Sequence, residues 1–289
     1  MGKTIYINSK PEISAIYFAL LQCGYDYYAF EKDAGLVKAI EGFRIEKGMH
    51  SDSFFMGVKQ SSCKVYSYWP RAAALETATF YLDSNHEKFK NFNAYRENIM
   101  SASNISDAER NLEFWAWVKN FPAALSHVFK SKEFQAYFTW ERKWIEQQNI
   151  IQENELSDIK RVLDSCEKYP PRIQKITIVL NPIKCAYSAD YHLDGNHLII
   201  ISGSFKPDSV IHEYLHHIVH PFVTKHKLSI LQYDTFYTGI DESYYLTGDS
   251  NGKINAFEEY AVRKLTDIVL TGKPPSDFKM FLREILNAK

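Results

Sequence analysis

The chain has 289 residues with a formal net charge of −1, and its hydrophobic and charged fractions of 45% and 24% are typical of a globular protein. This charge balance gives no basis for binding nucleic acid or an anionic membrane, so we expect neither as a partner. The four cysteines are scattered without C-x-x-C spacing, which excludes a zinc knuckle and argues against a disulfide framework. The start of the chain has no charged-then-apolar secretory pattern, so we expect a cytoplasmic protein.

The first part of the chain, residues 1–170, is predicted to be rich in helix. Residues 4–8 form a short strand-like run, and Pro11 lies at the start of a predicted helix over residues 10–24 with apolar positions at helical spacing. Residues 31–82 show helical patches interrupted by glycines, and residues 86–169 have helical periodicity with many aromatic side chains. We assign these aromatics to core packing between helices.

The second part, residues 171–289, begins with strands instead. Residues 174–180 are β-branched and end in an Asn-Pro turn, while residues 185–192 and 196–203 flank the Asp194-Gly195 step of a β-hairpin. The second hairpin arm is continuously apolar, as an inner strand is, and the first arm is polar enough for a sheet edge. We therefore expect an α+β fold, with a mostly helical N-terminal half and a small sheet in the C-terminal half.

A helix is predicted to follow the hairpin directly, over residues 207–221. Pro207 suits a first helical turn, Asp208 favours the positive end of the helix dipole, and Pro221 is expected to stop the helix. The residues of its apolar face are Ile211, Leu215, Ile218 and Phe222.

This helix contains the pattern H-E-x-x-H. Because residues four apart lie above one another on a helix, His212 and His216 can direct both imidazoles at one metal ion. Glu213 lies about a quarter-turn around, where it can take a proton from a metal-bound water without being a ligand. The alternative is an amphipathic helix with incidental histidines, and we favour the metal site.

A hairpin followed by an H-E-x-x-H helix resembles the zincin metallopeptidases. The resemblance implies a zincin-like sheet beside an active-site helix, one zinc ion per chain, and a peptide or protein substrate. Zincins of the three-histidine branch continue with a glycine and a third histidine, but Val219 and Phe222 stand at those positions. Gluzincins instead take the third ligand from a glutamate on a later helix. Residues 7–13, 212–221 and 259–263 together are similar to an uncharacterised bacterial family of gluzincin-type peptidases.

The third ligand that the resemblance calls for has more than one candidate. A predicted helix over residues 255–270 offers Glu258 and Glu259, and we favour Glu259 because Arg263 follows it four positions later and can support the site. Asp241 is a rival, since its surroundings faintly resemble the aspzincin pattern. For His217 and His220, which also belong to the first metal helix, we expect a place at the surface or a supporting role.

The ligand set predicts a mechanism and leaves one alternative. Zinc bound by His212, His216 and a carboxylate keeps a position open for water, and Glu213 would pass the proton of that water to the leaving amine. Tyr244 or Tyr245 could stabilise the oxyanion, and residues 186–191 could pair with an extended substrate as an edge strand. The alternative function is a non-catalytic, zinc-containing binding or regulatory protein on a zincin scaffold.

Overall fold

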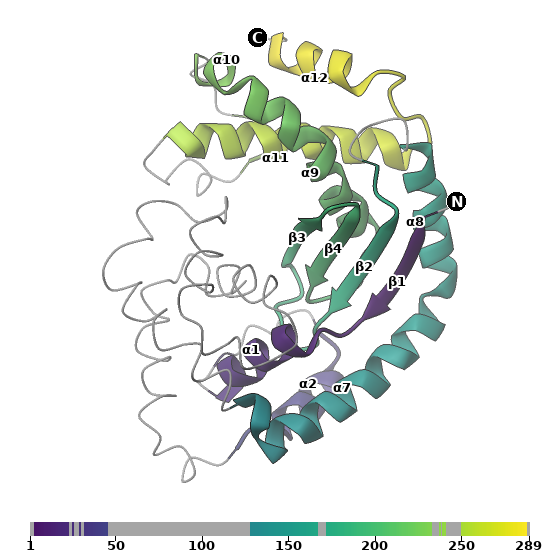
Figure 1. The fold of residues 1–289 in the computed structure, drawn as a ribbon, viewed down its shortest axis with the longest axis vertical. Helices are drawn as coiled ribbons and strands as arrows, with labels where there is room; N and C mark the ends of the chain where they lie inside the picture. The colour runs from purple at the N-terminus through teal and green to yellow at the C-terminus, as the bar shows by residue number, and fades with distance from the viewer. Residues whose placement is uncertain are drawn as a thin grey trace.

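The computed structural model describes residues 3–22, 25, 29, 32–45, 128–166, 172–232, 237, 239–240 and 250–287. Over these ranges the chain has an α+β fold in which helices surround one small sheet (Figure 1). The strands are β1 (Thr4–Asn8), β2 (Lys175–Leu180), β3 (Ala189–Asp194) and β4 (His197–Ser202). The helices are α1 (Pro11–Gln22), α2 (Ala34–Glu41), α7 (Lys132–Ile151), α8 (Glu153–Ser165), α9 (Pro207–Lys225), α10 (Lys227–Leu231), α11 (Ser250–Leu270) and α12 (Phe278–Asn287). Of the helical regions predicted over residues 31–82 and 86–169, residues 46–82 and 86–127 lie outside the described residues.

The sheet has the strand order β1-β2-β4-β3. β1, β2 and β4 are parallel, and β3 returns antiparallel to β4 through the hairpin. This arrangement confirms the prediction that the second hairpin arm is an inner strand and the first arm lies at the end of the sheet. β1 and β2 come from opposite sides of residue 170, so the sheet combines both predicted regions.

The loop between β2 and β3 corrects the predicted start of the first hairpin arm. The strand was expected from residue 185, but β3 begins at Ala189. The preceding residues turn instead, because Ser188 N–H donates to Cys185 O at 3.1 Å and closes a turn just before the strand. An earlier turn in the same loop is held by the Asn181 side chain, which accepts hydrogen bonds from the backbone N–H groups of Ile183 and Lys184 at 2.9 and 3.0 Å. The hairpin itself is confirmed, but Asp194 still pairs with His197, so its two turn residues are Gly195 and Asn196. Gly195 has a φ of 59°, where a side chain would cost energy.

One face of the sheet forms the hydrophobic core with the helices that carry the site. Alternate residues of β2 and β4 point to this face, and α9 packs on it with α8 and α11 beside it. The sheet residues of this core include Ile176, Ile178, Leu180, Leu198 and Ile200. The predicted apolar face of α9 is confirmed, because all four of its residues are buried.

α9 does not end at Pro221, as the sequence predicted, but continues to Lys225 with the proline inside. Proline removes one backbone N–H donor and crowds the carbonyl of His217 four residues earlier, which costs about 3 kcal/mol in an ordinary helix. The turn after it buries Phe222 and Val223 in the core, and this packing outweighs the local preference. α11 likewise begins at Ser250, five residues before its predicted start.

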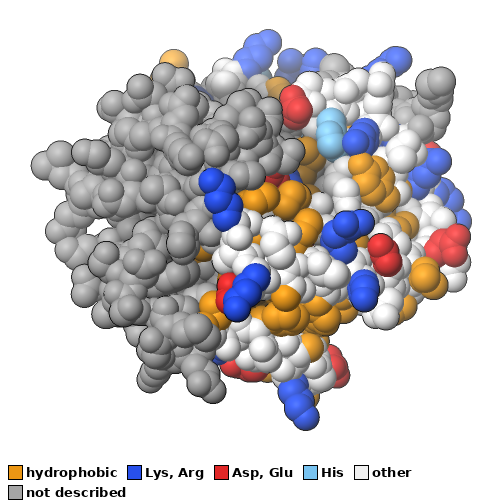
Figure 2. Space-filling model, turned by 60° about the horizontal axis from the view of Figure 1, so that its bottom comes forward, with side chains coloured by type: hydrophobic (Ala, Val, Ile, Leu, Met, Phe, Trp, Pro, Cys, Tyr) orange, Lys and Arg blue, Asp and Glu red, His pale blue; other side chains and the backbone are white. Residues whose placement is uncertain are grey.

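The surface of the described residues is mixed. On the face seen in Figure 2, Lys and Arg side chains lie singly among apolar and uncharged groups. The large apolar side chains that are most exposed are Leu228, Ile150 and Ile151. Among the helices that the structure describes, none combines the length and the apolar character needed to cross a membrane.

Candidate metal centre

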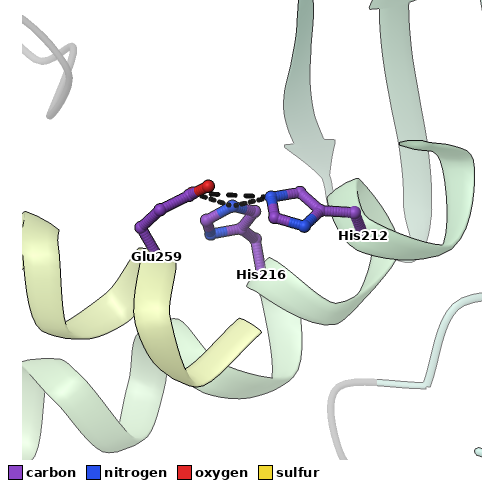
Figure 3. Close-up of side chains that lie close together, drawn as sticks. All are labelled: His212, His216 and Glu259. Atoms are coloured by element: carbon purple, nitrogen blue, oxygen red, sulfur yellow. Dashed lines mark hydrogen bonds and ion pairs between the residues drawn. The ribbon is translucent and has the colours of Figure 1, made fainter. Parts of the chain in front are cut away.

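The first two candidate ligands lie one turn apart on α9. His212 and His216 project to the same side, with ring centroids 5.0 Å apart and their Nε2 atoms 3.3 Å apart (Figure 3). Their spacing is a direct result of the helix that buries Ile211 and Leu215, since the core fixes which side of α9 remains for the histidines.

The third candidate ligand comes from α11, which packs against α9. Glu259 turns its Oε2 toward both imidazoles, 3.4 Å from His212 Nε2 and 3.6 Å from His216 Nε2 (Figure 3). These three side chains form a group that could hold a metal ion. The structure thus brings together the three residues that were predicted from the sequence as ligands.

The spacing of the three atoms can be tested against a metal. A tetrahedral zinc ion with bonds of about 2.0–2.2 Å separates its ligand atoms by about 3.3–3.6 Å. The three separations between His212 Nε2, His216 Nε2 and Glu259 Oε2 are 3.3, 3.4 and 3.6 Å. The distances between the two imidazole nitrogens and the carboxylate oxygen therefore match the spacing of three ligands around a tetrahedral zinc ion.

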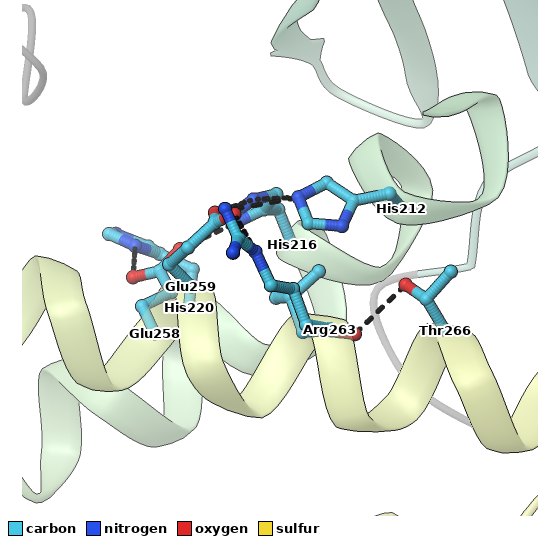
Figure 4. Close-up of polar contacts among 8 residues, drawn as sticks. His212, His216, His220, Glu258, Glu259, Arg263 and Thr266 are labelled. Carbon is cyan, nitrogen blue, oxygen red and sulfur yellow. Dashed lines mark hydrogen bonds and ion pairs between the residues drawn. The ribbon is translucent and has the colours of Figure 1, made fainter. Parts of the chain in front are cut away.

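Glu259 is held in place by the arginine one turn later. Arg263 donates from Nε to Glu259 Oε1 at 2.7 Å (Figure 4). A terminal nitrogen of Arg263 also donates to the carbonyl of Gly239 at 2.6 Å. The contact with Glu259 occupies the outer carboxylate oxygen and leaves Oε2 facing the histidines. Burial would raise the pKa of Glu259, but hydrogen bonds from His212 and His216 outweigh it and hold the pKa far below its ordinary value.

Glu258, the alternative ligand, contacts the opposite edge of the same histidine. Its Oε1 accepts from His216 Nδ1 at 3.0 Å and its Oε2 from His220 Nδ1 at 2.9 Å (Figure 4). Burial favours a higher pKa for Glu258, yet these two bonds lower the pKa to about 2. Glu258 therefore supports His216 at Nδ1, the ring nitrogen that does not face His212 and Glu259, and it is not one of the three candidate ligands.

The protonation of His216 reflects its two acidic neighbours. Burial lowers the pKa of His216, but hydrogen bonds to Glu258 and Glu259 overcome this effect and raise the pKa to about 10. A metal ion needs the lone pair of Nε2, so binding would displace the proton from that atom.

Glu213 is a buried carboxyl close to the candidate ligands His212 and His216. Burial raises its pKa to about 7, while the nearby His216 and His212 act in the opposite direction. A group with a pKa near neutrality is suited to accept and return a proton under physiological conditions. The environment of Glu213 therefore fits the role of a base that the motif predicts.

The terminal strand of the sheet also contacts the site. Tyr191 of β3 stacks on the ring of His216, with centroids 5.3 Å apart and an interplanar angle of 13°. The contact could not be predicted from the sequence, because Tyr191 stands 25 residues before His216 and its only signal is the alternation of side chains along a strand.

The other residues that the sequence analysis considered for the site lie in different environments or outside the described part of the chain. Asp241, Tyr244 and Tyr245 lie outside the described residues. His217, expected at the surface or in support of the site, is only 3% exposed and packs edge-on against Tyr214, because it faces the core side of α9. His220 does support the site, through Glu258.

The described residues thus form a candidate metal centre with two imidazoles, one carboxylate and an adjacent acid that can move a proton. Comparison with family models, curated proteins and solved structures finds no match for this chain.

Proposed function

We propose that the chain is a zinc-dependent peptidase of the gluzincin type. The observation that carries the proposal is the triangle of His212 Nε2, His216 Nε2 and Glu259 Oε2, whose sides of 3.3–3.6 Å match tetrahedral zinc. Imidazole nitrogens suit zinc among other metals, and three protein ligands leave one tetrahedral position for water, as in catalytic zinc sites.

The chain's own residues account for the proton transfers of peptide hydrolysis. When bound, zinc would polarise the scissile carbonyl and lower the pKa of a coordinated water to about 7. Glu213 accepts the proton of the attacking water and delivers it to the nitrogen of the departing amine. Its position supports this role, since it is a buried carboxyl on the same helix as His212 and His216 and close to both. Tyr244 or Tyr245 remains the proposed donor to the oxyanion.

The proposed substrate is an extended peptide that pairs with β3. In an antiparallel hairpin, pairs of residues that are hydrogen-bonded to each other alternate with pairs whose N–H and C=O groups point away from the partner strand. Gly203 N–H donates to Ser188 O, so these two residues form a hydrogen-bonded pair. In the pairs one and three positions farther along β3, the backbone groups therefore point away from β4. These pairs include Ala189 and Tyr191. These backbone groups point away from β4 on the strand whose Tyr191 side chain stacks on His216, so a peptide paired with this strand would lie next to the metal ligands.

The metal site is tested by the zinc content of purified variants. Wild type should bind one zinc ion per chain, and His212→Ala, His216→Ala and Glu259→Ala should each lose stoichiometric binding. Removing zinc with a chelator should abolish hydrolysis of a mixed peptide library, and adding zinc should restore it. Full zinc content in the His212→Ala/His216→Ala double variant would place the metal elsewhere.

The substrate strand is tested by a proline in β3. Ala189→Pro removes an N–H that points away from β4, so it should raise the KM for peptides while leaving zinc content unchanged. Ala189→Val is the matched control, because it adds volume and keeps the N–H. An unchanged KM in the proline variant would show that the substrate does not pair at this position.

A further inference from the structure

We infer that Glu258 and His220 are positioning residues that fix the orientation and tautomer of His216 for metal binding. The inference rests on the metal site of the proposed function, and it gives Glu258, which the sequence offered only as an alternative ligand, a role in orienting His216.

The first step is the hydrogen bond behind His216. A neutral imidazole has one N–H and one lone pair, and the acceptor that faces one nitrogen decides which nitrogen keeps the proton. Glu258 Oε1 lies 3.0 Å from His216 Nδ1, so the proton stays on Nδ1. The lone pair is then on Nε2, the atom that faces His212 and Glu259.

The second step concerns what fixes Glu258 itself. A glutamate side chain has three rotatable bonds, and a single hydrogen bond leaves it free to swing. Its second oxygen accepts from His220 Nδ1 at 2.9 Å, and His220 lies one turn beyond His216 on the same helix. One carboxylate thus bridges two histidines of α9 from α11, which ties the two metal-bearing helices together at the site (Figure 4).

The ring of His216 is consequently held from three directions. Glu258 contacts Nδ1, Glu259 faces Nε2, and Tyr191 covers one ring face. Glu258 is only 9% exposed, so water cannot readily replace its carboxylate as the partner of Nδ1. His220 is more open, with 46% of its side chain exposed, which fits a residue that acts through Glu258 and not on the metal.

The test measures zinc affinity by competition with a chromophoric chelator. Loss of the carboxylate behind a ligand histidine typically costs about 10–100-fold in metal affinity, and we expect a loss in this range for Glu258→Ala. Glu258→Gln keeps an acceptor for Nδ1 without the charge and should lose less. His220→Leu should weaken zinc binding, and His220→Asn, which returns an N–H near the position of Nδ1, should restore much of it.

Two further measurements separate positioning from general damage. The melting temperature of the metal-free variants reports on folding, and the visible spectrum of the cobalt-substituted protein reports on the ligand field, which should change in Glu258→Ala. Asp267→Asn is the matched control, because it neutralises an exposed carboxylate on the same helix and should leave both the zinc Kd and the spectrum unchanged.

Failure of the inference is distinguishable from failure of the metal site. If His212→Ala abolishes zinc binding while Glu258→Ala binds zinc within twofold of wild type, the site stands and the positioning role is overturned. If His212→Ala also binds zinc normally, the proposed site is wrong. An equal loss of affinity in His220→Leu and His220→Asn would show that the hydrogen bond to Glu258 is not what His220 provides.

Discussion

Replacing Glu141 by glutamine should make the protein more stable than the wild type at neutral and alkaline pH. Glu141 lies on α7 with no exposed surface, where it accepts a hydrogen bond from the Ser14 hydroxyl at 2.7 Å. Its second oxygen has no hydrogen-bond partner within the described residues. Burial raises the pKa of Glu141 from 4.5 to about 8, so the folded protein keeps the carboxyl protonated at neutral pH.

The magnitude follows from the proton balance. Between pH 4.5 and about 8, the unfolded chain has lost this proton and the folded chain still holds it, so rising pH favours unfolding. Each pH unit in this window is worth about 1.4 kcal/mol, so Glu141 reduces the free energy of unfolding by about 3 kcal/mol at pH 7 and about 5 kcal/mol above pH 8. Glutamine resembles the protonated acid in shape, and it does not titrate.

The assay is urea denaturation of both proteins at a series of pH values, with a chelator present throughout. We expect equal stability near pH 4 and a difference that grows with pH in favour of Glu141→Gln. Glu146→Gln is the control, since Glu146 is exposed on the same helix and its replacement should leave the pH dependence unchanged. Parallel curves for wild type and Glu141→Gln between pH 5 and 8 would refute the assignment of a buried, protonated Glu141.

Three further predictions concern packing and the metal. In Gly203→Ala, the new Cβ would lie 1.9 Å from the carbonyl oxygen of Cys185, so we expect a loss of at least about 1–3 kcal/mol in urea denaturation; an unchanged midpoint would contradict this contact. Arg263→Met frees Glu259 Oε1 and should weaken zinc affinity about tenfold in chelator competition, whereas an unchanged Kd would mean that the arginine does not orient the ligand. Free zinc at 100 times its Kd should stabilise the wild type by about 2.7 kcal/mol in thermal unfolding, and equal stabilisation of His212→Ala would exclude this site.

The parts of the fold that the sequence predicts are those with local signals. The hairpin of β3 and β4 is predicted by the Asp194-Gly195 step, and the inner position of β4 is predicted by its more apolar sequence. The position of His212 and His216 on one side of α9 follows from helical periodicity. The choice of Glu259 over Glu258 rests on a residue four positions later, and the structure places Arg263 in contact with Glu259.

The parts that the sequence does not predict depend on contacts between distant segments. The bond between Glu258 and His216 joins residues 42 positions apart, and the parallel pairing of β1 with β2 joins strands from opposite regions of the chain. α9 passes through Pro221 because the core holds the next turn, which no local rule contains. The first arm of the hairpin is shortened by a turn that Ser188 N–H closes on Cys185 O, close against Gly203 at the end of the second arm.

The most direct measurement of the proposed peptidase activity compares wild type with Glu213→Gln, each loaded with zinc, on a mixed peptide library analysed by mass spectrometry. Glutamine at this position cannot accept the proton of the attacking water, and it leaves the ligands His212, His216 and Glu259 in place. We predict that Glu213→Gln keeps one zinc ion per chain and the peptide affinity of the wild type, while its turnover falls by about 10²–10⁴-fold. Equal cleavage by the two proteins would contradict the proposed mechanism, and no cleavage by zinc-loaded wild type would favour a non-catalytic zinc-binding protein.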